Sequence, residues 1–413
     1  MRRLRLDRPV SPGATLARDI IGPAGEVLAR AGHPVSARTF EVLQGRGVMW
    51  CYVDDRWGEG IAATPLDGGG ATVRPLLRDF SRQIGILVAP LLNLSTNRAL
   101  ETLRGARPTA PLARSQVYDD FPAKARVFIE DCAHAEALAG YLVDRAAGGD
   151  LDGHAIGVAA VTSRLAALVG MDAREQLQAV CAALLHDIGM VFVPRSVLAI
   201  PHAQRSIPER IRYEAHTVLG EAMLQPLAGP SLHLSIVAAE HHEAVDGTGY
   251  PRKREGGNRL LRAAEEKRDV ERITLMSEVV AVADTYERIV SPSAGHEGVS
   301  PAAARALMED LAGHTLNREV VQRFLASFPE LPLGTEVRVT AGPHLGMTGI
   351  VSAVQAEGAE PPAVRLFLDA AGRPLEQPIE VRAQALKTLV EITDQPAPHA
   401  VTPGRNRRVR SVQ

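Results

Sequence analysis

The sequence predicts a mainly α-helical protein with a small α/β module near its start and a small β-barrel-like module near its end. Apolar residues recur at helical spacing from about Pro75 to about Phe328. After Pro332 apolar and polar residues alternate between Gly/Pro turns, which is typical of short antiparallel strands. A chain of 413 residues is long enough for two or three domains.

The segments follow in order. In the first module, strands over 16–20 and 26–29 and a third over 48–53 surround a short helix that Ser36 is expected to cap. The glycine run Gly68–Gly70 indicates a linker. We therefore predict a small α/β module over 1–56, a linker over 57–74, a helical connector over 75–120, the main helical domain over 121–330, a small β domain over 333–394 and a disordered basic tail over 395–413.

The composition excludes several classes of protein. A formal net charge of -2 gives no basic field for a nucleic acid polymer. No stretch reaches the roughly 20 uninterrupted apolar residues of a membrane span, and no secretory apolar region follows the start. The three cysteines, Cys51, Cys132 and Cys181, are odd in number and far apart, which fits a reducing compartment. These features predict a cytoplasmic protein.

Histidines and aspartates occupy apolar faces or ends of five predicted helices. Burying such side chains is costly unless they are paired or bind a metal. A single buried histidine is more often a hydrogen-bonded core residue, but a set of this size indicates a metal site. The set comprises His154, His186, Asp187, His216, His241, His242 and Asp284.

The spacing of these residues suggests two metal ions. Neighbours on a helix diverge by about 100°, so we expect His241 and His242 to serve different ions. Asp187, flanked by ligands, is the carboxylate expected to bridge them. Mixed imidazole and carboxylate ligands favour iron, manganese or zinc over calcium. Two such ions roughly 3.5–4 Å apart suit hydrolysis of a phosphate ester by a bridging water.

Two motifs carry a resemblance to a known family. His186-Asp187-Ile188-Gly189, together with His241-His242-Glu243 and the loop from Asp246 to Pro251, resembles the HD-GYP domain of the HD phosphohydrolase superfamily over about residues 125 to 330. The resemblance implies a helical HD-type bundle that hydrolyses cyclic di-GMP, a bacterial second messenger. It implies two or three transition-metal ions, most typically iron or manganese, bound by the seven residues named above.

Further roles follow from the resemblance. Asp150 takes the place of an acidic residue that holds a third ion in some members. Asp187 and His186 are expected at the catalytic centre with Tyr250, whose ring either positions substrate or packs the turn over the ligands. A homodimer or a signalling protein partner is compatible with this reading.

The chain departs from the family pattern where substrate phosphate is bound. Met190 replaces the usual lysine, and Ser293 and His296 stand where basic residues are common. Arg195, Arg252 or Lys253 are candidate substitutes for those charges, although each also fits a solvated surface position. We therefore predict a metal-dependent phosphodiesterase with weakened substrate binding. The alternatives are a catalytically degenerate regulatory protein and a phosphohydrolase of another nucleotide.

Overall fold

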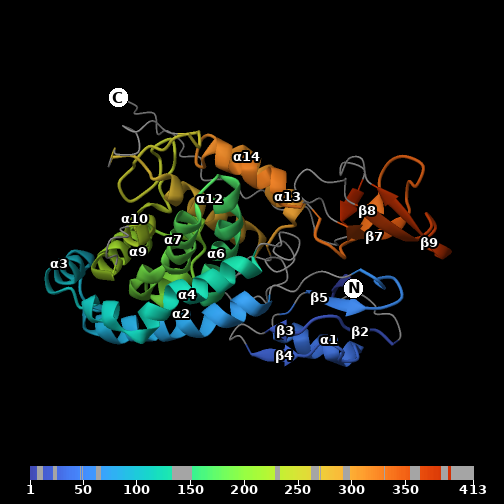
Figure 1. Ribbon diagram of the computed structural model, residues 1–413, viewed down its shortest axis with the longest axis horizontal. Helices are drawn as coiled ribbons and strands as arrows, with labels where there is room; N and C mark the ends of the chain where they lie inside the picture. Colours follow the sequence, from blue (N-terminus) through green and yellow to red (C-terminus); the bar gives the residue numbers. More distant parts are fainter. Residues whose placement is uncertain are drawn as a thin grey trace.

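The computed structural model describes residues 1–6, 13–21, 26–46, 48, 50–61, 67–132, 151–227, 233–261, 269, 271–291, 298–329, 331–353, 363–382 and 389–391. A helical body forms the middle of the chain, and two small sheets lie beside each other at one end of it (Figure 1). The prediction of a mainly α protein with small flanking modules is confirmed. The predicted tail over 395–413 lies outside the described residues.

The N-terminal module contains an antiparallel sheet in the order β1-β5-β2, a β3–β4 hairpin and one helix. Ser36 caps that helix, because its Oγ accepts a hydrogen bond from the Thr39 backbone. The expected strand over 16–20 is divided into two short strands, and the chain gains β1 at its start. The elements are β1 (Arg2–Arg5), β2 (Thr15–Leu16), β3 (Ile20–Ile21), β4 (Val27–Ala29), α1 (Ala37–Gln44) and β5 (Trp50–Asp54).

The helical body has one continuous apolar core, to which side chains from Val73 to Phe328 contribute. Helix α6 is apolar on nearly every side and packs against α7 and α12, as expected for a central helix. The described α-helices of the body are α2 (Asp67–Val88), α3 (Thr96–Ala106), α4 (Gln116–Asp131), α6 (Leu151–Leu168), α7 (Ala173–Leu185), α8 (Arg195–Leu198), α9 (Ile207–Leu224), α10 (His233–Glu240), α12 (Leu275–Val290), α13 (Pro301–Leu311) and α14 (Arg318–Ser327). The short 3-10 helices are η1 (Ala89–Leu91), η2 (Ala110–Arg114), η3 (Ile188–Phe192), η4 (His202–Gln204) and η5 (Gln225–Leu227).

Helix α2 starts at Asp67, inside the segment that the sequence suggested as a linker. Glycines lower helix propensity, so the run Gly68–Gly70 hides the first turns of this helix from pattern analysis. From Val73 onward α2 contributes buried side chains to the common core and packs along α4 and α6. The helical connector is therefore continuous with the core that surrounds the site.

The C-terminal strands form an antiparallel sheet in the order β10-β6-β7-β8-β9. Three of them match, to within one residue at each end, the strands that the alternation after Pro332 predicts over 336–340, 349–354 and 363–368. They are β6 (Glu336–Val339), β7 (Thr348–Ala353), β8 (Ala363–Leu368), β9 (Pro374–Arg382) and β10 (Leu389–Glu391).

The two flanking modules share one apolar cluster. Tyr52 and Ile61 of the N-terminal module pack with Val337 and Ile350 of the C-terminal sheet, although the whole helical body separates them in sequence. Polar contacts join the same surfaces: the Arg3 backbone N–H donates to the Gly334 carbonyl at 2.8 Å. Arg2 pairs with Asp55 and Glu336, and Trp57 stacks on Phe367. We name this unit the two-sheet clasp.

Candidate metal centre

Five helices bring the predicted ligands together at the centre of the helical body. His154 lies in the first turn of α6, His186 and Asp187 follow α7, and His216 lies in the middle of α9. His241 and His242 follow α10, and Asp284 lies within α12. Both aspartates and three of the histidines are buried, while His154 and His242 are partly exposed. The residues chosen from the sequence thus form one cluster, which is partly exposed at His154 and His242.

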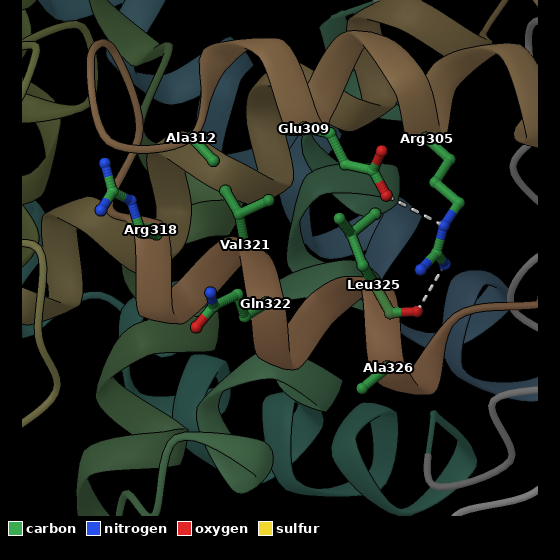
Figure 2. Close-up of a pocket in the computed structure, with 8 residues that line it drawn as sticks. All are labelled: Arg305, Glu309, Ala312, Arg318, Val321, Gln322, Leu325 and Ala326. Carbon is green, nitrogen blue, oxygen red and sulfur yellow. Dashed lines mark hydrogen bonds and ion pairs between the residues drawn. The ribbon is translucent and has the colours of Figure 1, made fainter.

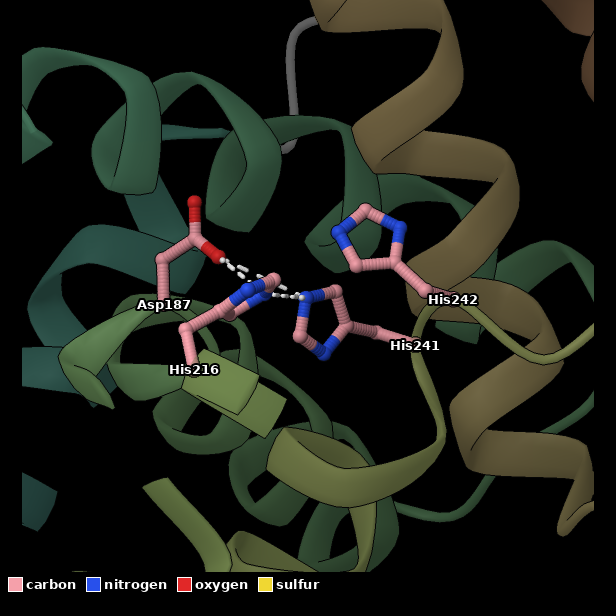
Figure 3. A group of neighbouring side chains, drawn as sticks. All are labelled: Asp187, His216, His241 and His242. Atoms are coloured by element: carbon pink, nitrogen blue, oxygen red, sulfur yellow. Dashed lines mark hydrogen bonds and ion pairs between the residues drawn. The ribbon is translucent and has the colours of Figure 1, made fainter. Parts of the chain in front are cut away.

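One oxygen of Asp187 faces a first group of histidines. Its Oδ1 lies 3.3 Å from Nε2 of His216 and 3.4 Å from Nε2 of His241. A ring nitrogen of His242 lies within 4.8 Å of the other ligand atoms of this group. Figure 3 shows these four side chains converging from three segments of the chain. We call this group the His216 subsite.

The other oxygen of Asp187 faces a second group. Its Oδ2 lies 3.5 Å from Nε2 of His154 and 3.5 Å from Nε2 of His186. Asp284 adds its Oδ1 at 3.0 Å from Nε2 of His154 and 3.7 Å from Nε2 of His186. We call this group the His154 subsite. Asp187 therefore presents one oxygen to each subsite, the arrangement expected of a bridging carboxylate.

Hydrogen bonds on the far side of the imidazoles orient these ligands. Nδ1 of His186 donates to the Ala183 carbonyl at 2.7 Å, and Nδ1 of His216 donates to the Tyr213 carbonyl at 2.6 Å. Nδ1 of His154 donates to Glu287 at 2.5 Å. In a neutral imidazole such bonds fix the tautomer and leave Nε2 as the atom with a free lone pair. In all three cases Nε2 is the atom directed toward Asp187.

The protonation states of most ligands suit metal binding. Burial alone would raise the pKa of the Asp187 carboxyl, but His186 and Arg288 hold that pKa well below its usual range. Asp284 behaves in the same way, because Arg288 and His154 outweigh burial. Burial lowers the pKa of His241 to about 4, so its ring is neutral at pH 7. Ionised carboxylates and neutral imidazoles are the forms that bind transition metals.

His154 differs from the other histidines in its protonation. Burial lowers its pKa, but the carboxylates of Glu287 and Asp284 together outweigh burial, and the pKa rises to about 9. A metal ion at the His154 subsite must therefore displace a proton at pH 7, which makes the two subsites chemically unequal.

Several buried polar atoms fit a bound cation. Within the part of the chain that the structure describes, Nε2 of His154, His186 and His242 and Oδ1 of Asp187 find no hydrogen-bond partner. Leaving such atoms buried and unsatisfied is costly, and metal ions in the two subsites would satisfy them. Imidazole and carboxylate donors suit a transition metal. The cluster can therefore hold a metal ion.

The structure differs from the expected division of His241 and His242. Their ligand atoms belong to the same group, together with Asp187 and His216. The expected divergence assumed that both residues are helical, whereas α10 ends at Glu240 and both lie in the turn that follows. Their ring centroids lie 4.2 Å apart.

The loop that follows the histidine pair is held by buried carboxylates. Glu243 accepts hydrogen bonds from the backbones of Arg252 and Arg254 at 2.7 and 3.0 Å. Gly249 allows a close approach, since a Cβ there would meet the Ala244 backbone nitrogen at 2.3 Å. The Tyr250 ring packs on the His242 ring at 4.8 Å. This contact favours packing over the ligands, which was one of the two roles considered for Tyr250.

Gly189 of the first motif packs against the helix that carries His216. A Cβ at this position would lie 2.0 Å from the His216 carbonyl oxygen, so α9 must move to admit a side chain. We expect Gly189→Ala to cost about 3 kcal/mol or more of unfolding free energy and to reduce the bound metal. Chemical denaturation and elemental analysis would measure both. Gly85→Ala is a matched control, because nothing lies within 4 Å of its added Cβ. Equal stability of the two variants would contradict this account.

The residues discussed for phosphate binding fall in different surroundings. Met190 is buried and packs with Val193, Val197 and Tyr213. Arg195 and Lys253 are exposed, and Arg252 pairs with Glu221. Asp150, Ser293 and His296 lie outside the described residues.

Two residues beside the ligands were missed by sequence reasoning. Glu287 holds His154, and Arg288 contacts both Asp187 and Asp284. They lie three and four positions after Asp284 on α12, within one turn of it. The helical spacing from Asp284 was the available signal.

A separate hollow lies between α13 and α14 (Figure 2). Its lining residues belong to these helices and the turn between them, and an ion pair between Arg305 and Glu309 crosses one end. The metal ligands lie on other elements.

The candidate site lies within a segment that matches a known family. Residues 133–320 match the family model of the HD domain. Over 227 residues the chain is 29% identical to a cyclic di-GMP phosphodiesterase of Pseudomonas aeruginosa, covering 55% of this chain and 50% of the relative. Over 192 residues it is 29% identical to 3'3'-cGAMP-specific phosphodiesterase 3 of Vibrio cholerae, covering 46% of this chain and 38% of the relative. The match thus spans half or less of the length of these relatives.

Among solved structures, the chain is similar to Bd1817, a HDG"Y"P protein of Bdellovibrio bacteriovorus. The TM-score is 0.47 and the identity 14%, covering 78% of this chain and 97% of that chain.

The buried cluster lies within the residues that match the HD domain. With its two motifs and its phosphodiesterase relatives, this part of the chain is similar to HD-GYP domain proteins. Within the described residues, no helix has the length and apolar character needed to cross a bilayer.

Proposed function

We propose that this chain is a metal-dependent phosphodiesterase that hydrolyses a cyclic dinucleotide, with cyclic di-GMP as the first candidate. The observation that supports this most directly is the orientation of Asp187, which presents one carboxylate oxygen to each of two histidine groups. Curated relatives at 29% identity are named phosphodiesterases of cyclic di-GMP and of 3'3'-cGAMP. We propose two or three ions, iron or manganese, with Asp150 as the added ligand for a third.

The roles of the side chains follow from their positions. Bound ions supply Lewis-acid activation of a water and positive charge for the phosphate oxygens. Asp187 would hold an ion with each of its two oxygens, and the backbone contacts of His186 and His216 keep their Nε2 atoms in place. Tyr250 covers His242 at the rim and restricts the approach of solvent from that side.

A cationic group near the cluster supports phosphate binding. The Arg205 guanidinium lies 3.9 Å over the Tyr213 ring, and Arg288 donates to the Tyr213 hydroxyl at 3.3 Å. Burial and the nearby Arg205, Arg210 and Arg288 lower the pKa of His202, which indicates positive potential in this region. The guanidinium group of an arginine can donate two parallel hydrogen bonds to the oxygens of a phosphate. We propose that these arginines replace part of the charge that Met190 removes.

Saturation kinetics of the Mn²⁺-loaded full-length chain test this function. We expect turnover of cyclic di-GMP with a raised KM, and a loss of at least about 100-fold in kcat/KM in His216→Ala. His33→Ala, an exposed histidine of the N-terminal module, is the control and should behave as wild type. Parallel assays with 3'3'-cGAMP and a linear dinucleotide identify the preferred substrate. A metallated chain that binds a dinucleotide without cleaving it would favour the regulatory alternative, and one that does neither would contradict the proposal.

We also propose a cytoplasmic location, supported by three buried cysteines that form no disulfide. A homodimer or a signalling protein partner stays a prediction from the sequence.

A further inference from the structure

Arg288 makes a fork of contacts into the metal centre. Its Nε donates to Oδ1 of Asp284 at 2.7 Å, and its Nη2 donates to Oδ2 of Asp187 at 3.1 Å. The two carboxylates are almost fully buried, whereas the Arg288 side chain is 36% exposed. The guanidinium therefore reaches in from the solvent side and joins the two carboxylates that face the Nε2 atoms of the histidines.

The oxygens that accept from Arg288 are those of one subsite. Oδ1 of Asp284 and Oδ2 of Asp187 are also the atoms nearest to Nε2 of His154 and His186. The other Asp187 oxygen, Oδ1, faces His216 and His241. The guanidinium thus contacts the carboxylate oxygens of the His154 subsite. It makes no such contact with Oδ1 of Asp187, the carboxylate oxygen of the His216 subsite.

A guanidinium and a metal ion compete for the same lone pairs when they share both carboxylate oxygens. The competition is unfavourable to the ion in two ways, because the arginine already compensates the buried negative charge and because two cations repel at close range. Arginine stays charged at every pH at which the protein is folded, so this competition does not depend on its titration.

We propose that Arg288 is an internal counter-ion that makes the two metal subsites unequal, weakening the His154 subsite and leaving the His216 subsite strong. An ion that enters the His154 subsite displaces the guanidinium from the two carboxylates, and the partly exposed side chain keeps its contact with the hydroxyl of Tyr213, whose ring lies under Arg205. Arg288 is thus a positioning residue that links occupancy of the second ion to the cationic group proposed for phosphate. This inference rests on the proposed metal-dependent function.

Titration of the full-length chain with Mn²⁺ alone, followed by calorimetry or by the EPR signal of free Mn²⁺, tests the inference. Wild type should show one strong and one weak class of sites. In Arg288→Gln the weak class should tighten by about tenfold or more, while the strong class changes by less than about threefold. Arg288→Lys keeps the cation and should stay close to wild type. It also provides a folded comparison if the glutamine variant is unstable.

Two controls sharpen the assignment. Arg82→Gln removes the same charge from an exposed ion pair on α2 and should leave both classes unchanged. His154→Ala should abolish the weak class alone. Unchanged affinities in Arg288→Gln, or equal tightening of both classes, would overturn the inference while leaving the proposed function intact. Absence of Mn²⁺ binding in every protein, wild type included, would overturn the proposed function and this inference with it.

Discussion

Asp187→Asn is expected to reduce the bound metal from at least two ions to fewer than one per chain. The substitution removes the negative charge that both subsites share and turns one of the two facing oxygens into an amide nitrogen, which donates rather than accepts. Turnover should fall on the order of 10³-fold or more, since the residue acts on both ions together. Elemental analysis and single-turnover kinetics measure the two effects.

Stability supplies an independent readout of the same variant. A ligand present at 1,000 times its Kd stabilises the folded state by about 4 kcal/mol, so loss of the ions should lower Tm clearly in metal-containing buffer. Asp172→Asn is the matched control. Asp172 caps α7, the helix that leads to His186, and asparagine caps helices equally well. Retention of two ions by Asp187→Asn would contradict the bridging role.

Trimming the chain to residues 115–332 is expected to yield an unstable protein, whereas residues 67–329 should fold and keep the metal. Helix α2 buries Val73, Leu77, Phe80, Ile84 and Val88 against the helical core. Each such side chain contributes about 1.5–3 kcal/mol, and the sum is comparable to the whole stability of an ordinary domain.

Thermal unfolding, gel filtration and metal analysis of the two fragments distinguish these outcomes. The fragment 67–329 excludes the two-sheet clasp, so it also tests whether the helical body folds without it. A monomeric, metallated 115–332 fragment with the Tm of the longer one would show that α2 and α3 are dispensable.

The ligands could be identified from the sequence because each one breaks a local pattern. His154, His216 and Asp284 interrupt the apolar faces of helices, and His186 and His241 follow the last residues of apolar helices. The helical period of the apolar residues therefore indicates each of these positions separately. Which ligands share an ion depends on where each helix ends. In the structure His241 and His242 fall in one group rather than in two, because α10 ends at Glu240 and both residues lie in the turn that follows.

Other features depend on contacts between distant segments, which one sequence does not display. In the sequence Arg288 is one of several charged residues of α12, and only the folded structure shows that it pairs with Asp187. Strand β1 was missed because three of its four residues are arginines, which ion pairs and stacking hold in the folded chain. The first turns of α2 were missed because tertiary packing overrides the weak helix propensity of glycine.

The shared cluster of the two flanking modules has a topological consequence. Since Tyr52 and Val337 lie in one apolar core, the helical body is in effect an insertion between β5 and β6 of a single small unit. Both its entry at Asp67 and its exit at Ser327 are tethered to that unit (Figure 1). A force or a ligand that shifts one sheet against the other would pull on both tethers at once, and α2 and α14 would carry the displacement into the core around the histidines.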